Sequence, residues 1–142
     1  MTVTALPAAG LRPAQDATRS ICVSFAPDAR RVEHMRRIAG AFLNRLGGVS
    51  EDSAYVVRLL VSELVSNAVQ HAETNDIAFT IGDDRSGLVQ ISVNDHAAAG
   101  ALMALAPAPG DESGRGLLLV DAFARSWGRD GTETWCVVKV SG

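Results

Sequence analysis

The stretch that decides the fold reads VSELVSNAVQHA and runs from Val61 to Ala72. Glu63, Asn67 and His71 recur at intervals of four residues, so on a helix they form one ridge. The apolar residues between them form a wide stripe of the kind that packs on a sheet. The segment therefore predicts a helix that covers a sheet and lends a carboxylate, an amide and an imidazole to a site. A solvated polar face bordering the core would show the same spacing.

Upstream of this segment, the sequence predicts the start of the same helix and an earlier strand and helix. Ser50 precedes Glu51 and Asp52, and acidic residues in a first turn favour a helix start through the helix dipole. The residues from 20 to 26 alternate like a strand, and Asp28 is a candidate cap for a helix that ends before Gly47.

Downstream, residues 76–81 and 88–95 read as two strands joined by the turn-rich stretch GDDRSG, which predicts a hairpin. Residues 96–113 are dominated by Ala, Pro and Gly, which is typical of a functional loop such as a lid. A helix then follows Gly116, and a closing strand at 133–140 follows a turn at 129–131. We expect an α+β fold, with a mixed, mainly antiparallel sheet carrying helices on one face.

The bulk properties restrict the kind of protein. With 142 residues the chain has the length of one domain, and we expect a flexible arm at 1–18 and the domain at 19–142. A net charge of -3 argues against a nucleic-acid binder, which usually carries a basic stripe. Neither a secretion signal nor an apolar run of ~20 residues stands out, so we expect a cytoplasmic protein without a membrane segment. Cys22 and Cys136 lie in apolar stretches, and we expect two buried thiols.

Three groups of residues carry chemistry. Glu63 is a candidate general base, and Asn67 offers a neutral oxygen to Mg²⁺, a hard cation that also binds nucleotide phosphates. Asp95 ends a strand, where it is either a turn residue or an acceptor for an exocyclic amine such as that of adenine. The stretch Ser113-Gly114-Arg115-Gly116 precedes a predicted helix, whose free N–H groups suit phosphate oxygens.

Together these segments resemble the ATPase superfamily shared by gyrase, histidine kinases and the DNA mismatch-repair MutL proteins. VSELVSNAVQHA is similar to its N-box, VNDHAAAG stands in the place of its first glycine box, and SGRGLLLV in that of its second. The E-x3-N-x3-H pattern and the ending GRGLLLVDAFA are most similar to the anti-sigma-factor serine kinases, particularly actinobacterial ones. The resemblance covers about residues 20 to 140 and implies a two-layer α/β sandwich, the Bergerat fold that binds ATP.

The resemblance implies a role for each matched residue. Glu63 becomes the catalytic base and Asn67 the magnesium ligand, while Asp95 reads adenine. A threonine near the last strand supports the aspartate, and the spacing nominates Thr132, or Thr134 after a short slip. The remaining nucleotide contacts come from His71, Ser113, Gly114, Arg115 and Gly116. The first glycine box departs from the pattern because Ala97 and Ala99 replace glycines, with Gly100 and Gly110 as substitutes.

By this resemblance the chain is an enzyme that uses ATP and Mg²⁺ to phosphorylate a serine or threonine of an antagonist protein of the STAS type. It also sequesters a sigma factor, with partners docking on the first helix and the lid, and family members often form homodimers. The alternative is a nucleotide-sensing switch that holds partners without efficient catalysis, which the altered first glycine box favours.

Overall fold

The sheet has five strands in the order β1-β2-β3-β5-β4, and each neighbouring pair is antiparallel. The computed structural model describes residues 19–96 and 112–140, so the predicted arm at 1–18 and nearly all of the predicted lid lie outside the described residues. The described elements follow one another as β1 (Arg19–Phe25), α1 (Arg30–Leu46), α2 (Glu51–His71), β2 (Ile77–Asp83), β3 (Leu88–Asn94), α4 (Glu112–Phe123), β4 (Ser126–Asp130) and β5 (Glu133–Lys139).

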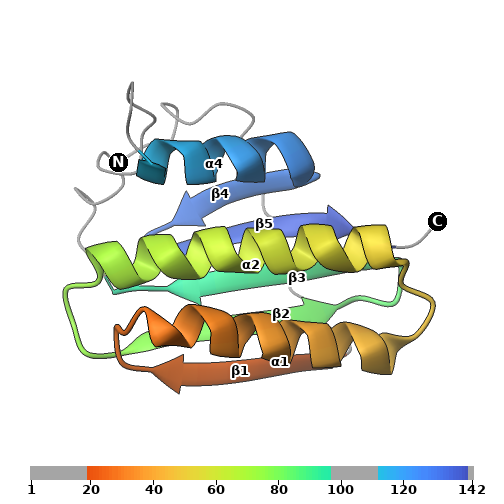
Figure 1. The fold of residues 1–142 in the computed structure, drawn as a ribbon, viewed down its shortest axis with the longest axis horizontal. Helices are drawn as coiled ribbons and strands as arrows, with labels where there is room; N and C mark the ends of the chain where they lie inside the picture. Colours follow the sequence, from red (N-terminus) through yellow and green to blue (C-terminus); the bar gives the residue numbers. More distant parts are fainter. Residues whose placement is uncertain (1–18, 97–111, 141–142) are drawn as a thin grey trace.

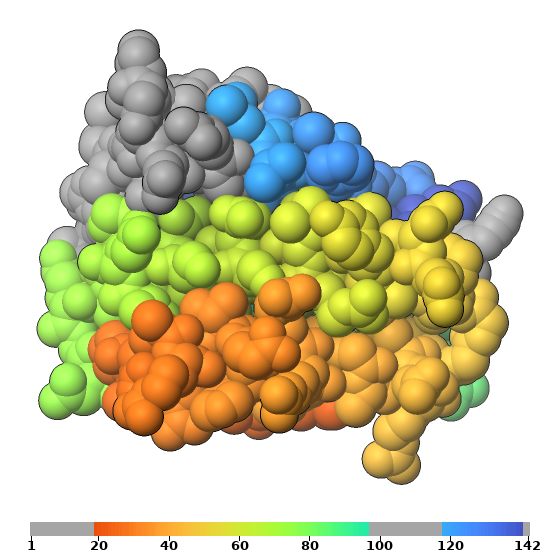
Figure 2. Space-filling model, viewed as in Figure 1, coloured from red at the N-terminus to blue at the C-terminus, as the bar shows by residue number. Residues whose placement is uncertain are grey.

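The three described helices lie side by side on one face of the sheet (Figure 1), and their side chains meet along that face (Figure 2). This arrangement confirms the predicted two-layer α+β fold. The pairing differs in one respect from the mixed sheet that we expected, because every strand pair of the described residues is antiparallel. No helix among the described residues is long and apolar enough to cross a membrane.

The core forms where α2 covers the middle strands. Alternate residues of β2 and β3 face the helices, because side chains of a strand alternate between its two faces. Phe79 and Ile91 are fully buried there, as are Leu60 and Val61 on α2. Burial of one such side chain stabilises the fold by about 1.5–3 kcal/mol, so α2 is held in place mainly by its apolar stripe.

The starts of α1 and α2 are built differently. Ser50 caps α2 as its side chain accepts a hydrogen bond from the Ser53 N–H at 3.1 Å. At α1 the predicted cap is wrong, because Ala29 occupies the N-cap position and has no side-chain cap bond. Asp28 instead accepts from the N–H of Arg30 at 2.9 Å and pairs with its guanidinium at 2.7 Å, and these bonds lower the pKa of Asp28 to about 2.

The C-terminal region holds two corrections. The predicted turn at 129–131 is wrong, because Arg129 lies inside β4 and the chain turns at Gly131, where φ is +60°. α4 begins at Glu112, so the second glycine box forms its first turn and does not precede it. Glycine is a poor helix former, which is why the sequence placed these residues outside the helix.

The two cysteines also differ from expectation. Cys136 is buried in the core, as predicted, but Cys22 is exposed on β1. β1 is an edge strand of the sheet, and Cys22 alternates with Ile21 and Val23, which pack against the core, so it lies on the opposite face. Since edge strands leave one face and one border open to solvent, the apolar sequence around Cys22 did not ensure its burial.

Candidate functional site

Four polar residues meet at one end of the sheet, on the face that the helices cover. Thr134 of β5 pairs with Val93 of β3 on one side and with Arg129 of β4 on the other. Asp95 follows Val93 by two residues and therefore lies on the same face. Asn67 is the fourth member and comes from the helix layer, since it lies on α2 and lines the same small cavity as Asp95 and Thr134.

We call this space the sheet-end cavity. It has a volume of about 10 Å³, and Leu64, Asn67, Ala68, Val93, Asp95 and Thr134 line it. A water molecule needs about 10–15 Å³, so the cavity as it stands has room for one water at most. Its lining combines an apolar floor with three polar side chains from α2, the end of β3 and β5.

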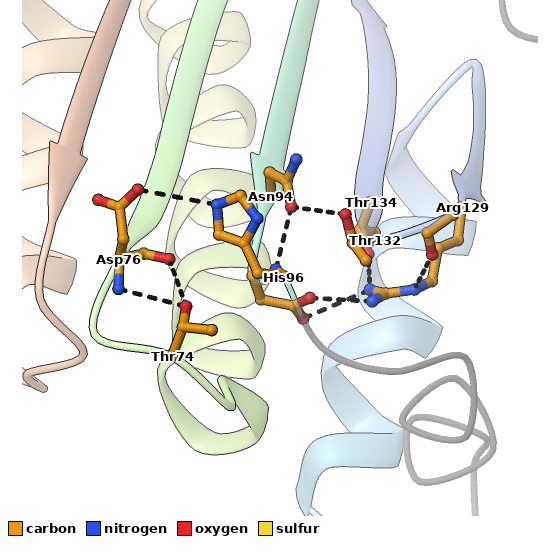
Figure 3. A network of polar contacts seen from close by, with 9 residues as sticks. Thr74, Asp76, Asn94, His96, Arg129, Thr132 and Thr134 are labelled. Carbon is orange, nitrogen blue, oxygen red and sulfur yellow. Dashed lines mark hydrogen bonds and ion pairs between the residues drawn. The ribbon is translucent and has the colours of Figure 1, made fainter.

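The backbone at Asp95 is held by a network shown in Figure 3. The Asp95 N–H donates to the carbonyl oxygen of Thr132 at 3.2 Å. Asn94 Oδ1 accepts from Thr132 Oγ1 at 2.8 Å and from the His96 N–H at 3.0 Å. The chain then turns at His96, where φ is +54°. These bonds fix the end of β3 to the β4–β5 turn and so fix where the Asp95 carboxylate stands.

Arg129 forms an ion pair with the carboxylate of Asp95. Its Nη2 lies 2.9 Å from Asp95 Oδ1, and its Nη1 lies 3.4 Å from Oδ2 and 2.8 Å from Thr134 Oγ1. Nε donates to the carbonyl of Gly131 at 3.1 Å. The side chains of Arg129 and Asp95 are only 2% and 5% exposed. A charge so deeply buried requires a partner, and each supplies it for the other.

Asn67 is buried and has an unused hydrogen-bonding group. It is 7% exposed, and its Nδ2 has no hydrogen-bond partner in the part of the chain that the structure describes. A buried polar group without a partner costs about 1–3 kcal/mol, and native structures contain few of them. This amide nitrogen beside the sheet-end cavity is a donor that remains available to a hydrogen-bond acceptor.

Glu63 and His71 lie one helical turn before and after Asn67, as the spacing predicted. Glu63 is half-buried, and this partial loss of solvent raises the pKa of its carboxyl above the usual value of 4.5. His71 Nε2 is buried and lacks a hydrogen-bond partner among the described residues. The three residues therefore do lie in one row on α2, and the middle one, Asn67, lines the sheet-end cavity.

The second glycine box stands at the same end of the molecule. Figure 1 shows the start of α4 beside the C-terminal half of α2, and both lie near the end of β3 and the β4–β5 turn. Ser113, Gly114, Arg115 and Gly116 belong to the first turn of α4, whose N–H groups have no partner within the helix. Trp127 Nε1 donates to Asp121 at 2.9 Å, which ties α4 to β4.

The resemblance left Thr132 and Thr134 as alternatives, and the two prove to do different things. Thr134 is buried and lines the sheet-end cavity beside Asp95. The hydroxyl of Thr132 donates to Asn94 and so belongs to the network that holds the backbone. The geometry favours Thr134 for contact with a ligand. The altered glycine box, Ala97 to Gly100, lies outside the described residues, as does Gly110.

Sequence reasoning missed two residues of the site, Arg129 and Asn94. Arg129 was placed in a turn, although Trp127 and Arg129 alternate with Ser126 and Gly128 before the Asp130-Gly131 turn. That alternation is the signal that predicts a strand with one face toward the core. Asn94 gave no signal, because its role depends on Thr132, 38 residues away in the chain.

Comparisons with known proteins bear on the family and the fold of the chain. The sequence pattern of the histidine kinase-like ATPase domain matches residues 25–139. The fold is similar to that of a solved chain containing the RsbU and RsbW domains of Rv1364c from Mycobacterium tuberculosis, with a TM-score of 0.57 and 18% identity. That match covers 87% of this chain but 32% of the other, so this chain spans about a third of it. No curated protein matches the sequence.

Proposed function

The chain belongs to the histidine kinase-like ATPase family, and on that premise we propose that it is an ATP-binding anti-sigma factor with protein serine/threonine kinase activity. Its substrate is a serine or threonine of an antagonist protein, and phosphorylation controls the sequestration of a sigma factor. The similar chain combines an RsbU and an RsbW domain, which supports a partner-switching role with protein partners.

One observation carries the proposal. Asn67, Asp95 and Thr134 come from separate elements and meet at one buried cavity, next to a helix start that offers free N–H groups. Such a carboxylate suits an exocyclic amine of a purine, and helix-terminal N–H groups suit phosphate oxygens. The chemistry of the lining fits a purine nucleotide, and Arg129 already pairs with the carboxylate that would meet the base.

The residues around the cavity take separate roles in this proposal. Asp95 and Thr134 bind the base, and Ser113, Gly114, Arg115 and Gly116 hold the phosphates at the start of α4. Asn67 would supply its amide oxygen to Mg²⁺, a hard cation that takes oxygen ligands. Its unpartnered Nδ2 is a donor and suits a hydrogen-bond acceptor of the nucleotide. When bound, Mg²⁺ neutralises the charge that spreads over the transferred phosphoryl group. His71, one helical turn after Asn67, is a further contact for the nucleotide.

Glu63 serves as the general base for the acceptor hydroxyl. A base works best when its pKa approaches the operating pH, and burial raises the pKa of Glu63 in that direction. Its position one turn before Asn67 places it on the ridge that carries the proposed metal ligand. Phosphoryl transfer otherwise depends on positioning and charge, which the cavity and α4 supply.

Partners dock on α1 and on the predicted lid at 96–113 in this proposal. α1 borders the helical face in Figure 2, and Arg30, Arg31, Arg37 and Arg45 are exposed along it. A chain of net charge -3 thus carries a cluster of positive charge on one helix, which favours a partner with an acidic surface. We place the protein in the cytoplasm, with a homodimer as its assembly.

A second function is favoured by the ion pair between Arg129 and Asp95. A protein whose base-reading carboxylate is occupied binds nucleotide weakly, and this suits a nucleotide-sensing switch that holds partners without efficient catalysis. The two functions differ in one measurable respect. A kinase transfers phosphate to a partner, whereas a switch only changes its affinity for partners when nucleotide binds.

The test combines binding and transfer on the full chain. We expect calorimetry to detect ATP binding that requires Mg²⁺, and γ-labelled ATP to label a STAS-type antagonist but not its variant lacking the acceptor hydroxyl. Glu63→Gln should bind ATP and fail to label. ATP binding without label on any antagonist would replace the kinase with the switch, and absence of ATP binding would reject both.

A further inference from the structure

Arg129 stands where a purine base would need to approach Asp95. Both carboxylate oxygens of Asp95 face guanidinium nitrogens, at 2.9 Å and 3.4 Å. A two-point contact between arginine and a carboxylate is among the stronger polar interactions in proteins. An exocyclic amine that approaches Asp95 from the side of Arg129 competes with these nitrogens for the carboxylate oxygens.

Arg129 also contacts the second residue that we assign to the base. Its Nη1 donates to Thr134 Oγ1 at 2.8 Å and so uses one of the two acceptor lone pairs of that hydroxyl. One side chain therefore binds both Asp95 and Thr134.

The position of Arg129 allows it to withdraw. β4 is the edge strand of the sheet, and Arg129 is followed by the exposed Asp130 and the turn at Gly131. Its remaining contact in the network is the carbonyl of Gly131, which belongs to that turn. The long side chain of an edge residue near a turn can exchange a buried position for a solvated one without disturbing the strand pairing.

We propose that Arg129 is the residue that sets nucleotide affinity and base preference, by competing with the purine for Asp95. In the closed arrangement the guanidinium occupies Asp95. A base whose amine donates to Asp95 binds only to the minor arrangement in which Arg129 has left, whereas a base without that amine gains nothing from its departure. This inference rests on the proposed ATP site. A ligand that needs a minor state loses affinity in proportion to that state's population, so a population of about 1–10% weakens binding by about tenfold to a hundredfold.

The test is calorimetric titration of the full chain with ATP or ITP in the presence of Mg²⁺. We expect Arg129→Val to bind ATP about tenfold to a hundredfold more tightly than the unmodified protein. Valine suits a strand position and has no donor for Asp95. The gain should be lost with ITP, whose purine carries a carbonyl at the position of the amine and so cannot donate to Asp95. Arg125→Val, which removes an exposed arginine just before β4, is the matched control and should leave both affinities unchanged.

A second variant protects the test against loss of folding, because Arg129→Val leaves Asp95 buried without its partner. Arg129→Gln keeps a donor but removes the charge and the second nitrogen pair, so we expect a smaller gain for ATP in the same direction. Circular dichroism confirms that each variant is folded before titration.

The outcomes separate this inference from the proposed function. If the unmodified protein binds ATP and both folded variants bind it equally or more weakly, Arg129 does not compete with the base, and ATP binding itself still stands. If neither the unmodified protein nor any variant binds ATP or ITP, the nucleotide site is wrong and this inference falls with it. A gain that is equal for ATP and ITP would also overturn the competition for Asp95.

Discussion

Glu63, the residue that we propose as the base, carries a cost to the fold. The carboxyl is half-buried on α2, and the lost solvent raises its pKa because the charged form is the better hydrated one. Ionisation of Glu63 therefore weakens the fold, and Glu63 is also the proposed base. Two measurements on one variant separate the effect on stability from the effect on phosphate transfer.

Replacing Glu63 by glutamine should reduce phosphate transfer by about 10²- to 10⁴-fold, because the variant lacks the base. ATP affinity should change little, since Glu63 does not belong to the sheet-end cavity. The assay is labelling of the antagonist at saturating ATP, with calorimetry for affinity. Glu51→Gln, which removes an exposed carboxylate in the first turn of α2, is the control and should keep full transfer. Equal transfer rates in the two variants would remove Glu63 from the mechanism.

The same variant should alter stability in a direction set by the pKa. A carboxyl whose pKa is raised in the folded state binds more protons there, so its ionisation lowers the free energy of unfolding as the pH rises above its usual pKa of 4.5. We expect Glu63→Gln to unfold at a higher temperature than the unmodified protein at pH 7. The difference should shrink as the pH falls and disappear below pH 4.5, where both side chains are neutral. A variant that is less stable at pH 7 would contradict this account.

The pair of Asp95 and Arg129 should reveal itself in stability as well as in binding. Removing one partner of a buried ion pair costs about 3–5 kcal/mol, because the remaining charge has lost its counterpart. We therefore expect Asp95→Asn to lower the free energy of unfolding strongly in urea denaturation. The double variant Asp95→Asn/Arg129→Gln should recover part of the loss. Additive effects of the two changes would mean that the pair is not coupled.

At the scale of elements, α2 combines two tasks that are usually separate. Its apolar stripe packs on β2 and β3, while the ridge of Glu63, Asn67 and His71 follows another side of the same helix. Because both sets of residues move together, the anchoring of α2 also sets the place of Asn67 at the sheet-end cavity. The cap at Ser50 contributes to that anchoring.

Loss of the cap should therefore be measurable. Ser50→Ala removes the acceptor for the Ser53 N–H, which costs about 1 kcal/mol and lowers the melting temperature by about 3–5 °C for a chain of this size. Ser53→Ala is the control, since only its backbone N–H takes part in the cap, and its melting temperature should change far less. Thermal denaturation followed by circular dichroism measures both. Equal shifts would mean that the hydroxyl of Ser50 contributes nothing.

The β4–β5 hairpin is the element that completes the site. β5 brings Thr134 beside Val93, and β4 brings Arg129 beside Thr134, so two residues of the cavity network depend on one turn at Gly131. The bonds from Asn94 and Asp95 to Thr132 attach that turn to the end of β3. The hairpin thus acts as the support on which the carboxylate of Asp95 is held.

At the scale of the whole molecule, the edge strand β1 is open to solvent, whereas the core between the two layers is closed to it. Cys22 on the edge strand β1 is exposed, and Cys136 on β5 is fully buried. Burial raises the pKa of the Cys136 thiol to about 12, so its reactive thiolate is essentially absent at neutral pH. The two thiols therefore report separately on the surface and on the core.

We expect a thiol reagent to modify one cysteine in the native protein and two after unfolding in denaturant. Cys22→Ser should abolish the native reaction and leave the second one unchanged. The rate at which Cys136 becomes reactive then measures opening of the core, and a nucleotide that binds should slow it, because binding to the folded state stabilises that state by mass action. Rapid reaction of both thiols in the native protein would contradict the burial of Cys136.

The sequence alone determined the helix from Ser50, the β2–β3 hairpin, the two-layer fold and the row of Glu63, Asn67 and His71, because these follow from local periodicity and capping. Only the tertiary structure decided which threonine faces the cavity, that Arg129 lies in a strand, and that this arginine occupies Asp95. The physical reason is distance along the chain: Asp95 and Arg129 are 34 residues apart, and their contact exists only once the strands are paired in register. Periodicity predicts which face a residue occupies within its own element, but strand pairing selects the partner that it meets there.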